Sequence, residues 1–335
     1  MPIQIDHTRT RELAPRFDEA LELVRNEFES LDSHRQYRNA FARLLKPDPL
    51  DRVLMMGTDQ RDLFVPHLQR TIETSLSKGG HIFDVGAGDG QTFALVAGSV
   101  PRGTRISIEE PNAEYLAAYT AFLRSQPHLE PGAAVEASFD DIDEASSRSA
   151  IALPDDGSVD LVLALQMLFF LSDLPAGLAR MVRFLRPGGT LFNVVADETD
   201  GYTGLTLNAF IEAGGDTGHN ERHQSAIAER RRLLGSPELG GGAIIDVLRE
   251  AGVPARLEAE LQPSRLYGHS LADLIALSNI SVLSEVDGTR KFEIAMKLLR
   301  DHPDAVDLRI EDDGPRRGMW SVTQPQWVSR LCRVG

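Results

Sequence analysis

The residues best suited to chemistry in this 335-residue sequence lie in the stretch HIFDVGAGDGQTFALVA, residues 81–97. An apolar run ends at Val85, and Gly86, Gly88 and Gly90 follow it at every second position. A helix-like run begins directly afterwards, so the stretch predicts a strand, a tight turn and a helix N-terminus. Such a turn brings backbone amides close to a polar ligand, and we expect a small molecule to bind there.

Three ligands suit a turn of this kind: a dinucleotide, a phosphate group and S-adenosylmethionine (SAM). The dinucleotide turn has glycines at its first, third and sixth places, whereas here the sixth place is Gln91. A phosphate-binding P-loop needs a lysine before its serine or threonine, and this stretch contains no lysine. SAM has no phosphates and does not need a wide anion cradle. A purely structural turn is the remaining alternative.

The next predicted strand ends in two carboxylates, Glu109 and Glu110, and Glu110 lies 20 residues after Gly90. A carboxylate at this place can accept hydrogen bonds from both ribose hydroxyls of an adenosine, which NAD and SAM share. Because adjacent side chains of a strand point to opposite faces, Glu109 is the alternative to Glu110 for this role. Asp84, just before the glycines, suits a ligand that carries an ammonium group.

The chain around this turn alternates between strands and helices. The expected strands are 81–85, 104–110, 133–137, 158–165, 190–195, 255–261 and 318–331. Because most of them lack polar alternation and are separated by helix-like runs, they predict a parallel sheet covered on both faces. The expected fold class is therefore α/β: a doubly wound, Rossmann-like, seven-stranded and mostly parallel sheet.

Three successive motifs resemble those of class I SAM-dependent methyltransferases: DVGAGDG (84–90), IEEPNAEYL (108–116) and LRPGGTL (185–191). The resemblance implies that the glycines and Asp84 lie near the methionine end of SAM and that Glu110 holds the ribose. It implies S-adenosylhomocysteine as the product. The cofactor-binding residues expected on this basis are Asp84, Gly86, Gly88, Gly90, Glu110, Ser138, Phe139, Asp140, Leu165 and Gln166.

A narrower resemblance begins at LALQMLFFLSDLPAGL, residues 163–178, which is similar to a stretch of histamine N-methyltransferases. That stretch has Gln-Met-Leu followed by two aromatics. Tyr37 and Phe41 match a Tyr-x-x-x-Phe helix of the same family, and Tyr202 stands where the family has an aromatic. The resemblance implies a small polar methyl acceptor, with an amine nitrogen, histamine-like or amino-acid-like, as the favoured atom.

The chemistry of methyl transfer suits these residue types. Gln166 follows a predicted strand, where open α/β sheets bind ligands, and its amide can orient a nucleophile. Aromatic faces can hold a cationic centre, although each aromatic can instead belong to the core. We expect Gln166, Phe169 and Tyr37 to be catalytic. The residues expected to bind the substrate are Tyr37, Phe41, Asp59, Gln166, Phe169, Phe170, Tyr202 and Arg265.

Two of these residues are expected to bind the substrate because of their charge. Asp59 is the nearest candidate for an acid that engages the acceptor amine, with an exposed acid at a helix start as the alternative. Arg265, in QPSRLYGHS, could bind a substrate carboxylate bidentately, with a solvated loop charge as the alternative. The second hypothesis for the function is transfer to the sulfur of a methionine-like thioether that carries a carboxylate. A non-catalytic SAM-binding sensor and an NAD-dependent oxidoreductase are further alternatives.

The expected organisation has four segments. They are an N-terminal helical cap (1–79), the SAM-binding core (80–196), a glycine-rich insertion or lid (197–242) and a C-terminal portion that completes the sheet and the substrate pocket (243–335). His219 and His223 are four residues apart, but the glycines around them argue against a helix and hence against a metal site.

The composition favours a cytoplasmic protein whose partner is a small molecule. The net charge of −15 argues against nucleic acid or an anionic membrane as the main partner. The lone Cys332 excludes an intramolecular disulfide, and the N-terminus lacks the apolar core of a signal peptide. The longest apolar stretches are too short to span a bilayer. The sequence does not indicate an oligomeric state.

Overall fold

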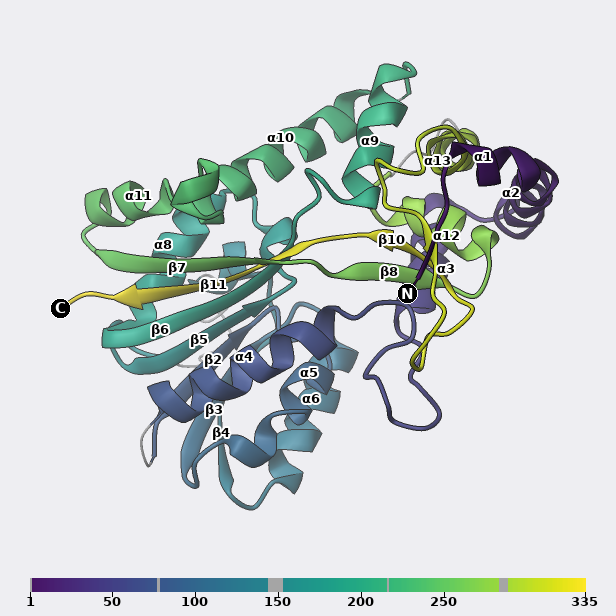
Figure 1. Ribbon diagram of the computed structural model, residues 1–335. Coiled ribbons are helices and arrows are strands. Elements are labelled where there is room, and N and C mark those ends of the chain that lie inside the picture. The colour runs from purple at the N-terminus through teal and green to yellow at the C-terminus, as the bar shows by residue number, and fades with distance from the viewer. Residues whose placement is uncertain (1, 77–78, 144–152, 216, 283–288) are drawn as a thin grey trace. The chain divides into compact units, whose positions relative to one another are not determined.

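The computed structural model describes residues 2–76, 79–143, 153–215, 217–282 and 289–335. The chain forms two compact units, each built from separate stretches of sequence. The first, here called the sheet unit, comprises residues 64–195, 230–261 and 327–335. The second, here called the helical unit, comprises residues 1–63, 196–229 and 262–326. Figure 1 labels most of the helices and strands of both units.

The sheet unit contains a seven-stranded sheet in the order β4-β3-β2-β5-β6-β11-β7. The strands are β2 (His81–Val85), β3 (Thr104–Glu109), β4 (Leu129–Val135), β5 (Val159–Leu165), β6 (Leu185–Ala196), β7 (Ala255–Gln262) and β11 (Gln326–Arg333). β2 pairs in parallel with β3 and β5, β3 with β4, and β5 with β6. The Rossmann-like, mostly parallel sheet predicted from the sequence is confirmed.

The strand order reverses at the centre of this sheet. From β2 the chain adds β3 and β4 on one side, and it then returns to the other side of β2 with β5 and β6. Open α/β sheets bind ligands at the carboxyl ends of the strands beside such a reversal. The glycine loop follows β2, and Gln166 follows β5. Both therefore lie at the edge of the sheet where a ligand is expected.

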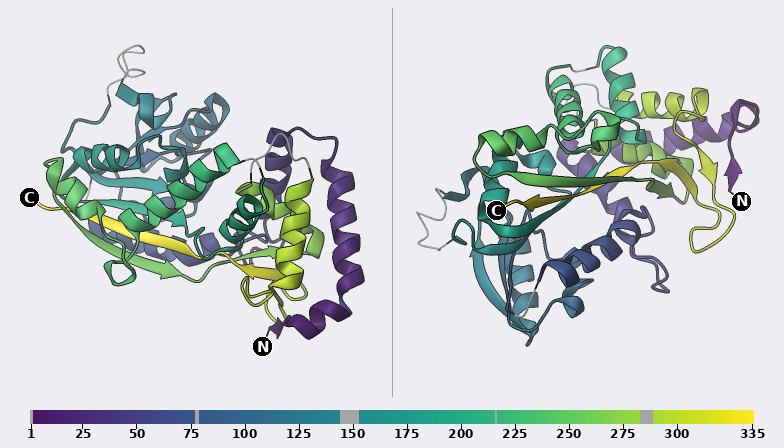
Figure 2. Two further views of the ribbon diagram at one scale, coloured as in Figure 1. Left: turned by 90° about the horizontal axis from the view of Figure 1, so that it is seen from above. Right: turned by 60° about the vertical axis from the view of Figure 1, so that its left-hand side comes forward.

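Helices cover both faces of the sheet (Figure 2). Leu68, Phe93 and Tyr119 of α4 (Gln60–Ser75), α5 (Gln91–Ala94) and α6 (Ala113–Ser125) pack with Ile82 in one core cluster. Side chains of α8 (Leu174–Phe184) and α11 (Ile244–Glu250) pack with Phe83 in another. Because Ile82 and Phe83 are adjacent on β2, their side chains point to opposite faces of the sheet. The burial of both explains why β2 has no polar alternation.

The helical unit consists mainly of helices around a small sheet, in the order β1-β9-β10-β8. Its helices are α1 (His7–Glu12), α2 (Ala14–Phe28), α3 (Ser33–Leu44), α9 (Tyr202–Glu212), α12 (Leu271–Leu277), α13 (Arg290–Asp301) and the first part of α10 (Thr217–Leu234). Its strands are β1 (Ile3–Gln4), β8 (Arg265–Gly268), β9 (Arg309–Ile310) and β10 (Trp320–Thr323). Phe28 and Phe292, with ring centroids 5.2 Å apart, lie in its core.

Two expectations about the elements are wrong. The single strand predicted over 318–331 is two strands, β10 in the small sheet and β11 in the large one. Pro325 lies between them, and proline has no backbone N–H for a strand ladder. The stretch around His223, expected to lack a helix, belongs to α10. Gly218 is in the first turn of that helix and Gly235 follows its end, so neither interrupts its middle.

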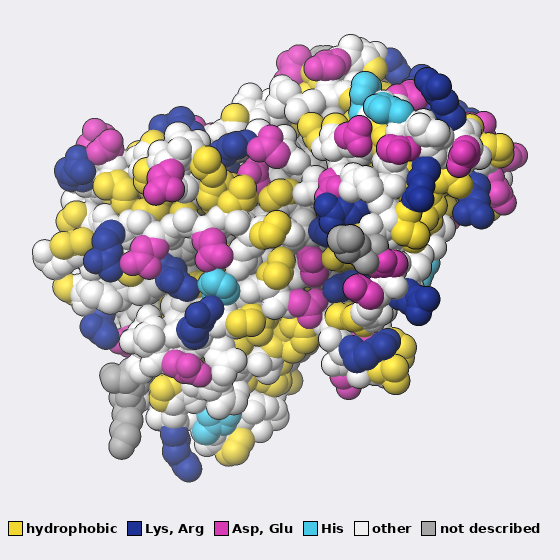
Figure 3. Space-filling view, in the orientation of Figure 1, with side chains coloured by type: hydrophobic (Ala, Val, Ile, Leu, Met, Phe, Trp, Pro, Cys, Tyr) yellow, Lys and Arg dark blue, Asp and Glu magenta, His cyan; other side chains and the backbone are white. Residues whose placement is uncertain are grey.

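The surface shows no concentration of one kind of charge on the face drawn in Figure 3, where basic and acidic side chains are interspersed. Among the described residues, none of the helices has the length and the apolarity that a membrane span needs. Cys332 is a free, half-buried thiol at the end of β11.

Gly204 on α9 gives a test of this packing. An added Cβ would lie 1.4 Å from the carbonyl oxygen of Glu198, whereas a Cβ at Gly98 would meet nothing within 4 Å. We expect Gly204→Ala to lower the free energy of unfolding by about 3 kcal/mol or more. Gly98→Ala should change it by less than about 1 kcal/mol. Urea unfolding measures both, and equal effects would contradict the close approach of α9 to Glu198.

Candidate active site

Carboxylates of the neighbouring strand hold the loop that follows β2. The Gly86 N–H donates to Oε2 of Glu109 at 2.9 Å, and the Gly88 N–H donates to Oε2 of Glu110 at 2.8 Å. Gly86, Gly88 and Gly90 have φ of 61°, 57° and 80°, in the left-handed region that favours glycine. The two glutamates thus fix a loop conformation that a residue with a Cβ could adopt only with backbone strain.

The three glycines differ in what surrounds them. An added Cβ would lie 2.5 Å from the Met167 side chain at Gly86 and 2.4 Å from the Tyr119 ring at Gly90. At Gly88 it would meet nothing within 4 Å. Gly86 and Gly90 are therefore required by packing within the protein. The open space at Gly88 fits a ligand that approaches the backbone of the loop.

Both glutamates at the end of β3 reach the loop, although adjacent strand residues normally point to opposite faces. Glu109 is part of β3 and is 1% exposed, whereas Glu110 follows the strand and is 8% exposed. Glu110 also accepts from the N–H of Asn112 at 2.9 Å through Oε1. Asn112 in turn caps α6 by accepting from the N–H groups of Glu114 and Tyr115. The strand end and the helix start thus orient Glu110 together.

Asp84 is a third buried acid at this place. Its Oδ2 accepts a hydrogen bond of 2.9 Å from the Tyr119 hydroxyl. Burial raises the pKa of Asp84 to about 7, against the opposing effect of the Tyr119 hydrogen bond. Burial also raises the pKa of Glu109 to about 8, and the charges of Glu110, Asp84 and Asp140 add to that rise. The cluster is therefore costly to ionise without a positive charge nearby.

These residues fit SAM. Its sulfonium and ammonium groups carry positive charge opposite to the acid cluster, and Glu110 can accept hydrogen bonds from ribose hydroxyls. The space at Gly88 admits a ligand at the loop backbone. When bound, SAM supplies a methyl group activated by its sulfonium. The chain's own part is to bind the cofactor and to orient the acceptor.

The expected adenine residues lie around η2 (Phe139–Asp141) in the sheet unit. Phe139 is 6% exposed and belongs to the core cluster under α8. The Ser138 hydroxyl donates to Asp141, and Asp140 accepts from the N–H of Ser172 at 2.9 Å. Their contact with adenine stays a prediction.

Gln166 has an unusual backbone at the end of β5. Its φ is 57°, a left-handed value rare in a residue with a long side chain. Its N–H donates to the carbonyl of Val194 on β6 at 2.8 Å, which anchors the strained residue, and Leu165 before it is half-buried. Phe169 in η3 (Leu168–Phe170) lies under the Arg230 guanidinium, 4.6 Å from the ring centroid.

The aromatic residues expected to contact the substrate have different surroundings. Phe170 is 75% exposed. Tyr37 and Phe41 belong to α3 of the helical unit, where their rings stack with centroids 5.9 Å apart and planes 10° apart. Tyr202 is fully buried, and its hydroxyl donates to the carbonyl of Leu274 at 2.9 Å. The side chain of Tyr202 belongs to the core of the helical unit, and its expected contact with the substrate stays a prediction.

The two charged residues expected to bind the substrate are occupied by the protein itself. The Arg265 side chain pairs with Asp307 at 2.7 Å and donates to Ser321, so a substrate carboxylate would compete with these partners. Asp59 accepts from the Arg265 N–H at 2.7 Å and from the Tyr267 hydroxyl at 2.9 Å. Burial raises the pKa of Asp59. It is a structural acid that joins the chain before α4 to β8.

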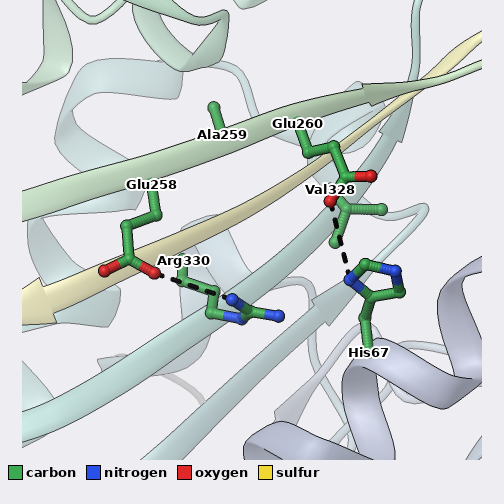
Figure 4. Close-up of a pocket in the computed structure, with 6 residues that line it drawn as sticks. All are labelled: His67, Glu258, Ala259, Glu260, Val328 and Arg330. Atoms are coloured by element: carbon green, nitrogen blue, oxygen red, sulfur yellow. Dashed lines mark ion pairs between the residues drawn. The ribbon is translucent and has the colours of Figure 1, made fainter.

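Neither a metal nor the cavity in Figure 4 changes this picture. Across the residues described, no three His, Cys, Asp or Glu side chains are placed to hold a metal ion, and the His219 side chain lies outside them. The cavity, of about 210 Å³, lies between α4 and strands β7 and β11. Its charged side chains pair with one another, His67 with Glu260 at 3.7 Å and Arg330 with Glu258 at 3.6 Å. No expected site residue lines it.

Residues 83–193, which contain the glycine loop and β3 to β5, match the family model described as a methyltransferase domain. The protein is accordingly a methyl-transferring enzyme (EC 2.1.1), and its cofactor is SAM. The matched segment is about a third of the chain, and it includes every residue that the sequence assigned to the cofactor.

Solved structures with a similar fold include the YcgJ protein of Bacillus subtilis, at 11% identity and a TM-score of 0.48, over 80% of this chain and 99% of that one. Another is phosphoethanolamine N-methyltransferase 2 of Haemonchus contortus in complex with SAM. Its identity is 10% and its TM-score 0.46, over 89% of this chain and 57% of that one. A third is a geranyl diphosphate methyltransferase in complex with sinefungin. Its identity is 14% and its TM-score 0.41, over 82% of this chain and 79% of that one. No curated protein matches the sequence. At these similarities the comparisons do not bear on the substrate.

Three residues of the site were missed from the sequence. Tyr119, the partner of Asp84, could have been suspected from its place on the helix after β3, since that helix covers the glycine loop. Asn112 carries the usual signal of a helix cap, two residues after Glu110. Arg230, over Phe169, gave no signal, because it lies 61 residues along the chain, within the charged run ERRRLL.

The acid cluster makes the stability of the cofactor-free protein depend on pH. The folded-state pKa of Asp84, about 7, lies above the ordinary value of 3.8 for an aspartate, so the native state binds more protons between these values and loses stability as pH rises. We compare the free energy of unfolding of Asp84→Asn with that of wild type. We expect this difference to shift in favour of the variant by at least about 1 kcal/mol when the pH is raised from 5 to about 8.5. Chemical unfolding at several pH values measures the difference. A constant difference would contradict the raised pKa, and the exposed Glu114→Gln is the control.

The cofactor assignment can be tested by direct binding. We expect Glu110→Gln to weaken SAM binding by about 10- to 100-fold, because a buried carboxylate that accepts hydrogen bonds is lost. Glu109→Gln, which replaces the carboxylate that accepts from the Gly86 N–H, should weaken SAM binding less. Calorimetric titration with SAM measures both. Unchanged SAM affinity in both Asp84→Ala and Glu110→Ala would overturn the assignment. If Glu109→Gln weakened SAM binding more than Glu110→Gln, Glu109 rather than Glu110 would be assigned to the ribose.

Proposed function

We propose that this enzyme transfers the methyl group of SAM to an amine nitrogen of a small polar metabolite. The observation that carries the proposal is the strained Gln166, with φ of 57°, at the carboxyl end of β5 beside the strand reversal. Strained residues persist where surrounding structure holds them, and they cluster at functional sites. A neutral amide there can accept a hydrogen bond from an amine and orient its lone pair for in-line attack.

Phe169 supports the same proposal. It lies three residues after Gln166, and the Arg230 guanidinium over its ring restricts its position. Alignment of the acceptor with the methyl group is the main source of rate in such a displacement. An aromatic side chain next to the orienting amide can define one wall for the acceptor. We keep Tyr37, which the resemblance to histamine N-methyltransferases assigns to the acceptor, as a third participant.

The main alternative was transfer to the sulfur of a thioether that carries a carboxylate. Arg265, the residue expected to bind a substrate carboxylate, pairs with Asp307 and donates to Ser321, and this bears equally on a thioether and on an amino-acid-like amine. The two differ in pH dependence, because an amine must lose its proton before attack whereas a thioether carries none.

The proposal is tested with SAM that carries an isotopically labelled methyl group, incubated with amines, amino acids and thioethers and analysed by mass spectrometry. We expect label on nitrogen, with kcat/KM rising about tenfold per pH unit below the pKa of the acceptor. Label on sulfur with a flat pH profile would contradict the proposal. Tight SAM binding without transfer to any compound would favour the sensor hypothesis.

Two variants of Gln166 separate its strain from its chemistry. Gln166→Gly removes the amide and relieves the left-handed backbone, so we expect kcat/KM to fall about 10- to 100-fold while the free energy of unfolding stays the same or rises by about 1 kcal/mol. Gln166→Asn keeps an amide and tolerates positive φ, so its loss of activity should be smaller. Full activity of Gln166→Gly would show that the amide has no catalytic part.

A further inference from the structure

The cavity in Figure 4 lies at one edge of the large sheet, entirely within the sheet unit. Its volume is about 210 Å³, and its walls come from α4, β7 and β11. In the strand order, β11 is three places from β2, the strand that leads to the glycine loop. The cavity is therefore separate from the candidate active site, and its charged side chains need an explanation of their own.

Arg330 of β11 supplies the positive charge of the cavity. Its side chain is 31% exposed, and its Nε donates to Oγ1 of Thr71 on α4 at 3.1 Å. Among the described residues this is the one hydrogen bond of the Arg330 side chain. The Glu258 carboxylate lies 3.6 Å from its Nη1, which is too far for a hydrogen bond. The outer end of the guanidinium can therefore donate to a ligand.

Glu260 of β7 supplies the negative charge. Its Oε2 lies 3.7 Å from Nδ1 of His67 on α4, again too far for a hydrogen bond (Figure 4). Burial lowers the pKa of His67, so its ring is neutral at neutral pH and above. Glu258 differs, because it lies between Arg256, at 3.3 Å, and Arg330. In the part of the chain that the structure describes, no Lys or Arg pairs with Glu260.

The pairing of the two strands sets the spacing of these opposite charges. The Val334 N–H donates to the Pro254 carbonyl at 2.8 Å, so the end of β11 lies beside the start of β7 and the strands are antiparallel. This register places Glu258 opposite Arg330, and Glu260 diagonal to Arg330 on the same face. Diagonal neighbours of this kind have Cα atoms about 7–8 Å apart. A ligand with one charge would meet a like charge here, whereas a ligand with both charges would match both residues.

We propose that this cavity binds a small zwitterion, with its carboxylate on the Arg330 guanidinium and its ammonium group on the Glu260 carboxylate. A guanidinium matches a carboxylate with two parallel hydrogen bonds. The cavity is smaller than the pockets of drug-sized ligands, which measure about 300–1,000 Å³. Val328 and Ala259 add small apolar surfaces to its lining. Amino acids with small side chains are the class that fits, and the inference does not depend on the amine acceptor proposed above.

The test uses the full chain saturated with S-adenosylhomocysteine, which fills the place where the cofactor's own amino-acid group binds. L-Alanine, β-alanine and 4-aminobutyrate are zwitterions of increasing length. L-Alaninamide keeps only the ammonium group, and propanoate keeps only the carboxylate. We expect calorimetry or ligand-observed NMR to show that at least one zwitterion binds, and that either singly charged probe binds more weakly by about fivefold or more.

Matched variants assign the binding to the cavity. Glu260→Gln and Arg330→Gln each remove one charge and should each weaken the bound zwitterion by about fivefold or more. Glu73→Gln and Arg102→Gln remove the same charges from exposed positions outside the cavity and should leave the affinity unchanged. Arg330→Lys, which keeps the charge and loses the planar fork, should also weaken binding and replaces Arg330→Gln if that variant does not fold. Thermal unfolding shows whether each variant is folded.

Several results would overturn the inference. They are absence of binding by all three zwitterions, equal binding of a singly charged probe, and an affinity that is unchanged in Glu260→Gln and in the Arg330 variants. A zwitterion that binds only when S-adenosylhomocysteine is left out would lie at the cofactor site and would also overturn it. The labelled-methyl experiment reports on the acceptor alone, so the proposed function and this inference can fail independently.

Discussion

The hold of two adjacent glutamates on the glycine loop is the interaction on which the rest of the site depends. Glu109 and Glu110 accept the N–H groups of Gly86 and Gly88, and so the end of β3 sets the conformation of the loop after β2. The parallel pairing of these two strands brings the acids and the loop to the same edge. With Asp84 they form a buried acid cluster whose charge suits a cationic cofactor.

The same constraint explains the packing around the loop. Gly90 needs to be glycine because the Tyr119 ring fills the space of a side chain, and the hydroxyl of that ring reaches Asp84. One helix therefore supports both the loop and the acid before it. On the far side of the reversal, β6 anchors the strained Gln166 through the carbonyl of Val194. Rigid strands thus position the residues that we assign to the cofactor and to the acceptor.

The sequence was informative where the signal is local. Glycine spacing, the apolar run before it and the paired acids after the next strand predicted the fold, because each depends on neighbours within about one strand and one helix. The contacts of the assigned residues with the cofactor stay a prediction. The split of 318–331 into β10 and β11 had one local signal, Pro325. The pairing of Arg265 with Asp307 had none, because it joins residues 42 apart in the chain.

Contacts between distant parts of the chain also determine the surroundings of the expected substrate residues. Tyr202 is near a loop in the sequence, yet its ring lies in the core and its hydroxyl is bonded to Leu274. Asp59 resembles an exposed acid at a helix start, yet β8 covers it.

The most direct test of the central claim is a crystal structure of the full chain with S-adenosylhomocysteine. The account predicts the ligand at the carboxyl ends of β2 and β3, beside Gly88, with its ribose hydroxyls on the carboxylate of Glu110. A ligand bound elsewhere, such as the cavity between α4 and β7, or a ribose that contacts neither Glu110 nor Glu109, would contradict it.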